Sequence, residues 1–291
     1  MPSRPQPTVS AALLRQRGLI RVDGTAARSF LQGLVTNDVE KVDKTTPVYA
    51  ALLTPQGKFL HDFLIVQIGE SLFLDIERER TADLLKRLKM YRLRAPVDLE
   101  DVTQAWTIFA IFGEGAGVMG DRMPGTAVRD PRNTALGLRL YCQGDPRQDI
   151  ESFGIPIVGV RAYDALRVAA GVPDGSRDIP VEKAFPLEYG FNALDAVSYD
   201  KGCYIGQELT ARTHNRGKVK KGLYRVRFEN QAPDAGTAIV MGSIEVGEVL
   251  SGAGNFALAH LRIDAAETSQ PLVAGKSSIV ERVEAPVAPS G

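Results

Sequence analysis

The sequence predicts an α+β protein that ends in a small all-β domain. In the first part of the chain, apolar spacing favours a strand at 19–22, a helix at 26–34 and a strand at 48–53. A charged amphipathic helix is expected at 77–91, because its leucines fall at helical spacing. After residue 219 the pattern changes to short apolar runs separated by glycines, which favours a small barrel or sandwich.

The remaining elements follow from alternation and from breaker residues. Four further strands are expected before the all-β region, at 63–68, 71–76, 106–112 and 137–142. Gly, Pro and Arg gather at about 120–134, which favours a polar loop there. A helix at 161–170 should end at Gly171, since glycine commonly closes a helix. Within the last region the expected strands are 223–228, 238–241, 245–250, 256–263 and 277–283.

Composition sets the broad class. With 291 residues and 44% hydrophobic content, the chain can bury enough surface for two or three domains. Thirty-five basic residues balance thirty-five acidic ones, so no overall field attracts nucleic acid or a membrane. No apolar run approaches the ~20 residues that span a bilayer, and residues 1–5 lack a secretory apolar region. We therefore expect a cytoplasmic protein without membrane contact.

The most informative stretch is the run Lys-Gly-Cys-Tyr-Ile-Gly-Gln-Glu at 201–208. Gly202 directly precedes Cys203, and Gly206 follows three residues after it. A helix is expected from Gln207 onward. A helix N-terminus and the charge of Lys201 favour a thiolate, so Cys203 fits a nucleophile or a metal ligand. The alternative is an inert packing cysteine. The second cysteine, Cys142, lies in an apolar strand pattern that favours packing.

Two cysteines cannot build an iron-sulfur site that needs four thiolates. Cys203 could serve only as one ligand among several, with the others supplied by a partner or a second subunit. A zinc site from Cys203, Glu208 and His214 is conceivable, but its spacing matches no usual zinc signature. The ligand count therefore favours a transient, shared cluster.

A dense group of basic residues follows the cysteine: Arg212, His214, Arg216, Lys218, Lys220 and Lys221. Such a group suits a folate polyglutamate tail, a phosphate backbone or an acidic patch on a partner. It also suits a solvated surface, and the sequence leaves these alternatives open.

Residues 171–226 closely resemble the YgfZ and Iba family of iron-sulfur cluster proteins, a branch of the folate-dependent glycine-cleavage T-protein superfamily. The likeness rests on Gly-Val-Pro, Asp-Ile-Pro and Pro-Leu-Glu blocks and on the run at 201–208. It continues more weakly through residues 19–22, 30–38 and 258–262. The resemblance implies a three-domain ring with a first domain built from separated segments. It places a T-protein-like folate-binding-type α+β region at 8–95 and 160–218, an intervening α+β segment at 96–159 and a C-terminal β-barrel at 219–285.

The resemblance also implies site residues. T-protein enzymes use an Asp in a Gly-Gly-x-x-Asp-Asp block, and Asp62 matches it, with His61 beside it. A carboxylate that caps a turn or a strand end is an alternative role for Asp62. The Glu with which those enzymes contact the pterin is replaced by Ala169, although Glu188 could take its place. Their Lys-Gly-Asp is Lys-Gly-Cys here, which exchanges a hard carboxylate for a soft thiolate. The residues expected to bind tetrahydrofolate are Asp62, Glu188, Tyr204, Gln207 and Arg212.

The function implied is an assembly or repair factor for iron-sulfur proteins rather than an enzyme. It would use Cys203 and Lys201, share a transient cluster with A-type carrier proteins, and serve 4Fe-4S client enzymes, including those that methylthiolate tRNA. Two alternatives stay open. A folate-dependent aminomethyltransferase is disfavoured by Ala169 and by Cys203. An RNA-binding module is disfavoured by the zero net charge and the lack of an RNA-binding motif, so no direct nucleic-acid contact is expected.

Overall fold

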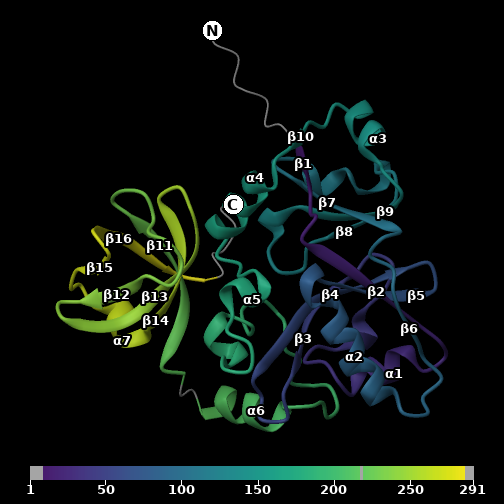
Figure 1. The fold of residues 1–291 in the computed structure, drawn as a ribbon, viewed down its shortest axis with the longest axis horizontal. Coiled ribbons are helices and arrows are strands. Elements are labelled where there is room, and N and C mark those ends of the chain that lie inside the picture. Colours follow the sequence, from purple (N-terminus) through teal and green to yellow (C-terminus); the bar gives the residue numbers. More distant parts are fainter. Residues whose placement is uncertain (1–8, 217–218, 286–291) are drawn as a thin grey trace. The chain divides into compact units, whose positions relative to one another are not determined.

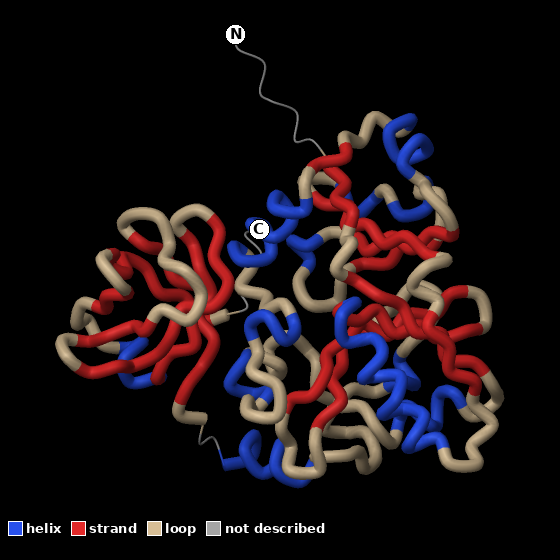
Figure 2. The backbone as a smooth tube through the Cα atoms, in the orientation of Figure 1, coloured by secondary structure: helices blue, strands red, loops and turns tan. Residues whose placement is uncertain are grey.

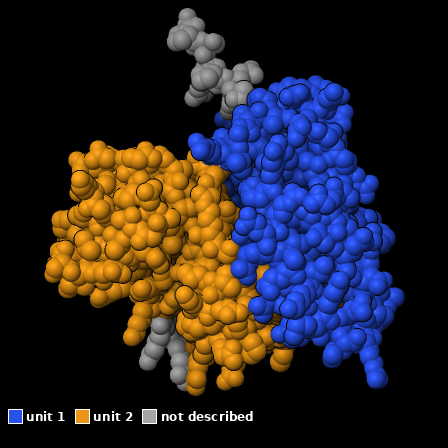
Figure 3. Space-filling model, viewed as in Figure 1, with its two compact units in different colours: residues 1–27, 41–48, 64–163 blue, residues 28–40, 49–63, 164–291 orange. Residues whose placement is uncertain are grey.

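The computed structural model describes residues 9–216 and 219–285. The chain divides into two units, each made of separated segments (Figure 3). Unit 1 comprises residues 1–27, 41–48 and 64–163, and unit 2 comprises residues 28–40, 49–63 and 164–291. Figure 1 traces the helices and strands along the chain, and Figure 2 separates them from the loops.

One sheet lies wholly in unit 1, with the strand order β10-β1-β7-β9-β8. Its strands are β1 (Ser10–Leu13), β7 (Trp106–Phe112), β8 (Thr126–Arg129), β9 (Leu138–Gln143) and β10 (Ile157–Val158). All neighbours are antiparallel except β1 and β10, which run parallel. Alternate side chains such as Phe109, Ile111 and Leu140 form its core, together with the buried Cys142. The strands expected at 106–112 and 137–142 are confirmed.

A second sheet has the order β3-β4-β5-β2-β6. Its strands are β2 (Arg17–Asp23), β3 (Val48–Leu53), β4 (Phe59–Ile68), β5 (Ser71–Glu77) and β6 (Asp98–Asp101). Helix α2 (Thr81–Arg92) follows β5 and buries Leu84 and Leu88 completely, as an amphipathic helix should. The strands expected at 19–22, 48–53, 63–68 and 71–76 and this helix are therefore confirmed.

A network of buried charges holds unit 1 together. Arg139, 2% exposed, donates from Nη1 to Asp75 at 3.1 Å and from Nη2 to Asp130 at 3.0 Å. Arg17 donates from Nε to the same Asp75 at 2.6 Å, and the Tyr141 hydroxyl donates to it at 2.9 Å. Burial alone would raise the pKa of Asp75, but Arg17 and Arg139 hold that pKa below its ordinary value. The arginine side chains are therefore fixed in place by charged hydrogen bonds.

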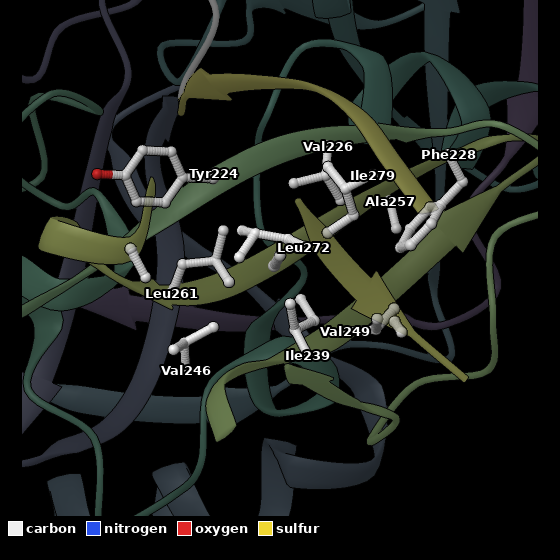
Figure 4. Packing of buried hydrophobic residues seen from close by; sticks show 13 residues of the cluster. Tyr224, Val226, Phe228, Ile239, Val246, Val249, Ala257, Leu261, Leu272 and Ile279 are labelled. Carbon is white, nitrogen blue, oxygen red and sulfur yellow. The ribbon is translucent and has the colours of Figure 1, made fainter. Parts of the chain in front are cut away.

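The C-terminal strands of unit 2 close into a barrel with the order β11-β14-β13-β12-β15-β16. They are β11 (Lys221–Phe228), β12 (Ala238–Met241), β13 (Ile244–Ala253), β14 (Phe256–Arg262), β15 (Leu272–Ala274) and β16 (Ser277–Glu284). Inward side chains such as Val226, Phe228, Ile239 and Leu261 fill the interior (Figure 4). The predicted small β domain is confirmed as a barrel. Sequence reasoning missed β15, whose three residues are too few to show alternation.

The remaining helices are α1 (Ala27–Gln32), α3 (Arg147–Ser152), α4 (Val160–Ala169), α5 (Gly175–Asp178), α6 (Gln207–Arg216) and α7 (Ile263–Glu267). The helices expected at 26–34, at 161–170 and from Gln207 are confirmed within a few residues. The loop expected at about 120–134 is wrong in part, because it contains the edge strand β8. That strand pairs with β9, the next strand along the chain, and buries Val128.

Candidate functional site

Cys203 is exposed, whereas Cys142 is buried. Cys203 lies in an irregular loop, and three residues separate it from the start of α6. The Sγ of Cys142 donates to the Pro124 carbonyl oxygen at 2.7 Å, and burial raises the pKa of this thiol to about 11. Of the two thiols, therefore, Cys203 is the one placed to meet another molecule.

The loop is anchored before the cysteine by Lys201. Its ammonium is buried and donates to the carbonyl oxygens of Val35 and Asn37, each at 2.7 Å. Burial lowers the pKa of Lys201 to about 8, although nearby Asp38 acts in the opposite direction. Lys201 is expected to support a thiolate with its charge. In the structure its ammonium also ties the loop to the segment that precedes β3.

Neighbouring hydrogen bonds extend this anchor. The Thr36 hydroxyl donates to the Ala196 carbonyl oxygen at 2.6 Å, and the Ser198 amide donates to the Thr36 carbonyl oxygen at 3.0 Å. The Asn37 side-chain amide donates to the Asp195 carbonyl oxygen at 2.6 Å. The segment that enters the cysteine loop is thus held along its length.

A close backbone contact anchors the loop after the cysteine. Gly206 has a positive φ of 82°, and a Cβ there would stand 2.5 Å from the Thr54 carbonyl oxygen and 3.1 Å from the Gly57 Cα. Gly57 itself, with φ of 72°, closes the turn between β3 and β4. A side chain at position 206 would be both strained and in collision with this turn. Gly206 therefore serves packing.

Gly202 differs from Gly206. Its φ is not positive, and apart from its chain neighbours no described atom lies within 4 Å of where a Gly202 Cβ would stand. The two glycines on either side of Cys203 therefore have different roles. Packing explains Gly206, whereas open space lies beside the cysteine at Gly202.

The other predicted residues of this stretch lie at the start of α6. The Tyr204 ring is buried, 5.3 Å from the Lys201 ammonium, and the Tyr204 amide donates to the Gln207 side chain at 3.4 Å. Arg212 and His214 are exposed on α6. Of the other basic residues, Lys220 and Lys221 are exposed, while the side chain of Arg216 and all of Lys218 lie outside the described residues. Lys201, Cys203 and Tyr204 thus lie in one loop, and Gln207 begins the helix that follows it.

Asp62 lies within strand β4 and is only 4% exposed. Its carboxylate accepts a hydrogen bond from the Tyr49 hydroxyl of β3 at 2.8 Å. A capping role at a turn or strand end is therefore wrong. Asp62 and Tyr49 thus form a buried, hydrogen-bonded pair in the interior of unit 2.

Glu188 lies in the short 3-10 helix Pro186–Tyr189, beside His260 of β14. The His260 Nε2 is 3.8 Å from Glu188, and its ring stacks on Tyr189 with centroids 4.5 Å apart. Burial raises the pKa of Glu188, although Lys221 and Lys58 oppose that shift. Burial and then Lys221 lower the pKa of His260 to about 4. Sequence reasoning missed His260 as a site residue. The only signal was a histidine within an apolar strand, which is equally typical of a core position.

The described residues contain neither a cluster of metal-binding side chains nor a helix that could cross a membrane. Across 9–216 and 219–285, no three His, Cys, Asp or Glu residues gather as metal ligands, so Cys203, Glu208 and His214 form no such group. None of the described helices combines the length and apolarity needed to cross a bilayer.

Comparison with known proteins defines the class. Residues 14–121 match the GCVT N-terminal domain, and residues 220–289 match the CAF17 C-terminal beta-barrel domain. The structure resembles the glycine cleavage system aminomethyltransferase T of Bartonella henselae, with a TM-score of 0.75, 16% sequence identity, and coverage of 94% of this chain and 84% of that one. The chain is thus a protein of T-protein-like fold with a closed C-terminal barrel, which confirms the predicted fold class.

Two relatives identify the family. The human mitochondrial iron-sulfur cluster assembly factor IBA57 is 34% identical, with 88% of this chain and 79% of the relative covered. The mouse protein of the same name is 30% identical, with 91% and 80% covered. The chain belongs to the IBA57 family of iron-sulfur cluster assembly factors. The comparisons support the Iba side of the expected resemblance and give no support for the bacterial YgfZ label.

The location expected from the sequence is contradicted. These relatives, and the similar proteins of Coccidioides immitis and Pyricularia oryzae, are named as mitochondrial. The cytoplasmic expectation rested on the absence of a secretory apolar region, and a mitochondrial targeting segment needs no such region.

Proposed function

We propose that this protein hands on iron-sulfur clusters through Cys203, as one thiolate in a site shared with a partner. The observation that carries the proposal is an exposed thiol in a loop anchored on both sides, by Lys201 before it and by Gly206 after it. An anchored loop presents the sulfur in a constant position, and open space beside Gly202 leaves room for a partner. The assembly role of its relatives agrees with this chemistry.

The transfer step is a ligand exchange. The Cys203 thiol releases its proton to solvent as its sulfur binds iron, and one thiolate of the carrier leaves the iron and takes up a proton. No electron is transferred in this step. Since Cys203 is the single exposed cysteine among the described residues, the partner must supply the remaining ligands. This dependence favours a short-lived complex over a resident cluster.

The proposed partners are A-type carrier proteins, which deliver the cluster, and 4Fe-4S client enzymes, including those that methylthiolate tRNA. Exposed cations at Arg212, Lys220 and Lys221 suit an acidic patch on such a partner. Lys201 supports the loop, while Tyr204 and Gln207 order its exit into α6. The effect on tRNA would be indirect, through the client enzyme.

Tetrahydrofolate is a second proposed ligand, which Glu188 and Asp62 of unit 2 would hold. A half-buried carboxyl group suits the amino and amide edge of a pterin, and Glu188 is such a group. The fit is incomplete, because Ala169 provides no carboxylate and Asp62 already accepts a hydrogen bond from Tyr49. We therefore propose modest affinity.

A strain that lacks this protein tests the cluster role. Cys203→Ser should leave the protein level normal, because an exposed thiol replaced by a hydroxyl costs well under ~2 kcal/mol. Activity of 4Fe-4S enzymes and tRNA methylthiolation should fall towards the level of the deletion. Cys142→Ser is the matched control, since it alters the buried thiol, and it should restore activity wherever the protein accumulates. Full rescue by Cys203→Ser would refute the assignment of this residue.

Isothermal titration with a reduced folate tests the second ligand separately. Glu188→Gln and Asp62→Asn should weaken binding, and Arg129→Ala, an exposed residue of unit 1, should leave it unchanged. Unaltered binding to both site variants would place the folate elsewhere.

A further inference from the structure

Unit 1 contains a pocket of about 480 Å³ that the cluster chemistry does not use. It is lined by the connection between β1 and β2, by residues 103–108 at the start of β7, and by the turn after β9. This volume lies within the range typical of sites for small organic ligands. Each of its lining segments belongs to unit 1, so the pocket is complete within that unit.

The lining is strongly cationic. Arg15, Arg78 and Arg147 are exposed at its rim, and the buried Arg17 lies beneath. Asp145, the single acidic residue of the lining, pairs with Arg147 at 3.1 Å. Since Arg17 is paired with Asp75, the three rim arginines against Asp145 give a local charge of about +2 in a chain whose net charge is zero.

The buried hydrogen-bond network around Asp75 fixes the side chain of Arg17. The Arg17 Nε donates to Asp75 at 2.6 Å, and Asp75 also accepts a hydrogen bond from Arg139. Two guanidinium groups therefore share this carboxylate. Arg139 also pairs with Asp130, which Arg132 shares at 2.7 Å, so three arginines face two carboxylates across the network. The network therefore holds Arg17 rigidly and keeps one positive charge in excess.

One wall of the pocket is aromatic. Trp106 lines it and is half-buried, and its ring is held against Phe73 with centroids 5.2 Å apart. The floor is polar as well as apolar, since Thr103 and Gly18 lie there beside Leu19. An indole fixed in this way offers a face for stacking, while the arginines offer paired N–H donors.

We propose that this pocket binds a nucleoside phosphate, with the base against Trp106 and the phosphates among Arg15, Arg78 and Arg147. Arginine pairs bidentately with phosphate oxygens, and any planar nucleobase can stack on an indole ring. A ligand that carries both parts fills the pocket better than either part alone. The site lies in unit 1, whereas Cys203 and its anchors lie in unit 2.

The sequence supplies a direct probe, because Trp106 is the single tryptophan of the chain. Titration of the full-length protein with metal-free ADP should quench its intrinsic fluorescence in a saturable manner. Adenosine and inorganic pyrophosphate, as separate probes, should each bind more weakly than ADP. Rising salt should weaken ADP and pyrophosphate binding but leave adenosine binding almost unchanged.

Variants at the rim test the contact residues. Arg78→Ala and Arg147→Ala should each raise the Kd for ADP by about tenfold, since a hydrogen bond to a charged group commonly carries that much. Both residues are exposed, so the fold should be unaffected. The matched control is Arg129→Ala, an exposed arginine of unit 1 outside the pocket lining, and it should bind ADP like the unaltered protein.

Trp106→Leu, followed by calorimetry, tests the aromatic wall. It should reduce ADP affinity to that of pyrophosphate. Absence of quenching by ADP, or equal ADP affinity in the Arg78, Arg147 and Arg129 variants, would overturn the proposed site. If the unaltered protein bound pyrophosphate as tightly as ADP, the proposed stacking on Trp106 would be wrong.

Discussion

The buried Nζ of Lys201 donates to the Val35 carbonyl oxygen at 2.7 Å, so the residue two positions before Cys203 is tied to a segment 166 positions earlier in the chain. The same ammonium reaches the Asn37 carbonyl oxygen at 2.7 Å. A single charged group thus fixes where the cysteine loop begins. The order of this loop therefore depends on a contact distant in sequence.

Lys201→Met should lower the free energy of unfolding by about 1–3 kcal/mol, because two buried carbonyl oxygens lose a charged donor. It should also make Cys203 more mobile, which amide hydrogen exchange across 199–206 would report as faster exchange. Lys220→Met, at an exposed lysine, is the control and should alter neither measurement. Unchanged exchange in Lys201→Met would mean that the loop has other sufficient anchors.

The two glycines that flank Cys203 should respond differently to alanine. Gly206→Ala should destabilise the protein by about 2–4 kcal/mol, because the residue has φ of 82° and its Cβ would stand 2.5 Å from the Thr54 carbonyl oxygen. Gly202→Ala should cost less than about 1 kcal/mol yet weaken binding of a cluster carrier, since it fills space beside the thiol. Urea unfolding and carrier binding separate these effects. Equal destabilisation by both substitutions would contradict the distinction.

His260 should contribute to acid sensitivity. Its pKa in the folded protein is about 4, against 6.5 when exposed, because burial and then Lys221 disfavour its charged form. Between these pH values the unfolded chain binds the extra proton, so stability is full above pH 6.5 and is lost as pH falls towards 4. His260→Gln should remove this loss, on the order of 2 kcal/mol, in urea unfolding at a series of pH values. A His260 NMR resonance that titrates near pH 6.5 would exclude the effect.

The two thiols should differ strongly in alkylation rate. Cys203 is exposed, whereas Cys142 is buried, donates to the Pro124 carbonyl oxygen and has its pKa raised to about 11. Iodoacetamide acts on the thiolate, so one equivalent should react rapidly under native conditions. Mass spectrometry should locate that label at Cys203, and Cys203→Ser should lack the rapid phase. Comparable labelling of both cysteines would be inconsistent with the structure.

Local patterns in the sequence predicted most of the fold. The strand at 48–53 and the helix from Gln207 begin where the sequence predicts them. Strands β1, β6, β8, β10 and β15 were not predicted, since two to four residues carry too little periodicity. The repeated short strands favoured a small barrel or sandwich, and pairing between β11 and β16 closes the sheet into a barrel.

The candidate site was predictable in part. Cys203 and its loop followed from the motif, and the structure exposes this thiol. The contact of Lys201 with Val35 could not be predicted, because no local pattern encodes a hydrogen bond across 166 positions. His260 beside Glu188 is a similar case, since 72 residues separate them and only the fold brings them together. Such long-range pairs depend on the packing of whole elements.

Anaerobic spectroscopy of cluster transfer is the decisive measurement. A cluster-loaded A-type carrier is mixed with the unaltered protein, Cys203→Ser or Cys142→Ser, and the visible absorption and circular dichroism of the cluster are followed. With the unaltered protein and with Cys142→Ser, the spectrum should change at one equivalent as a new thiolate enters the iron coordination. With Cys203→Ser it should remain that of the carrier alone. The same spectral change with Cys203→Ser would contradict a cluster-ligand role for this thiol.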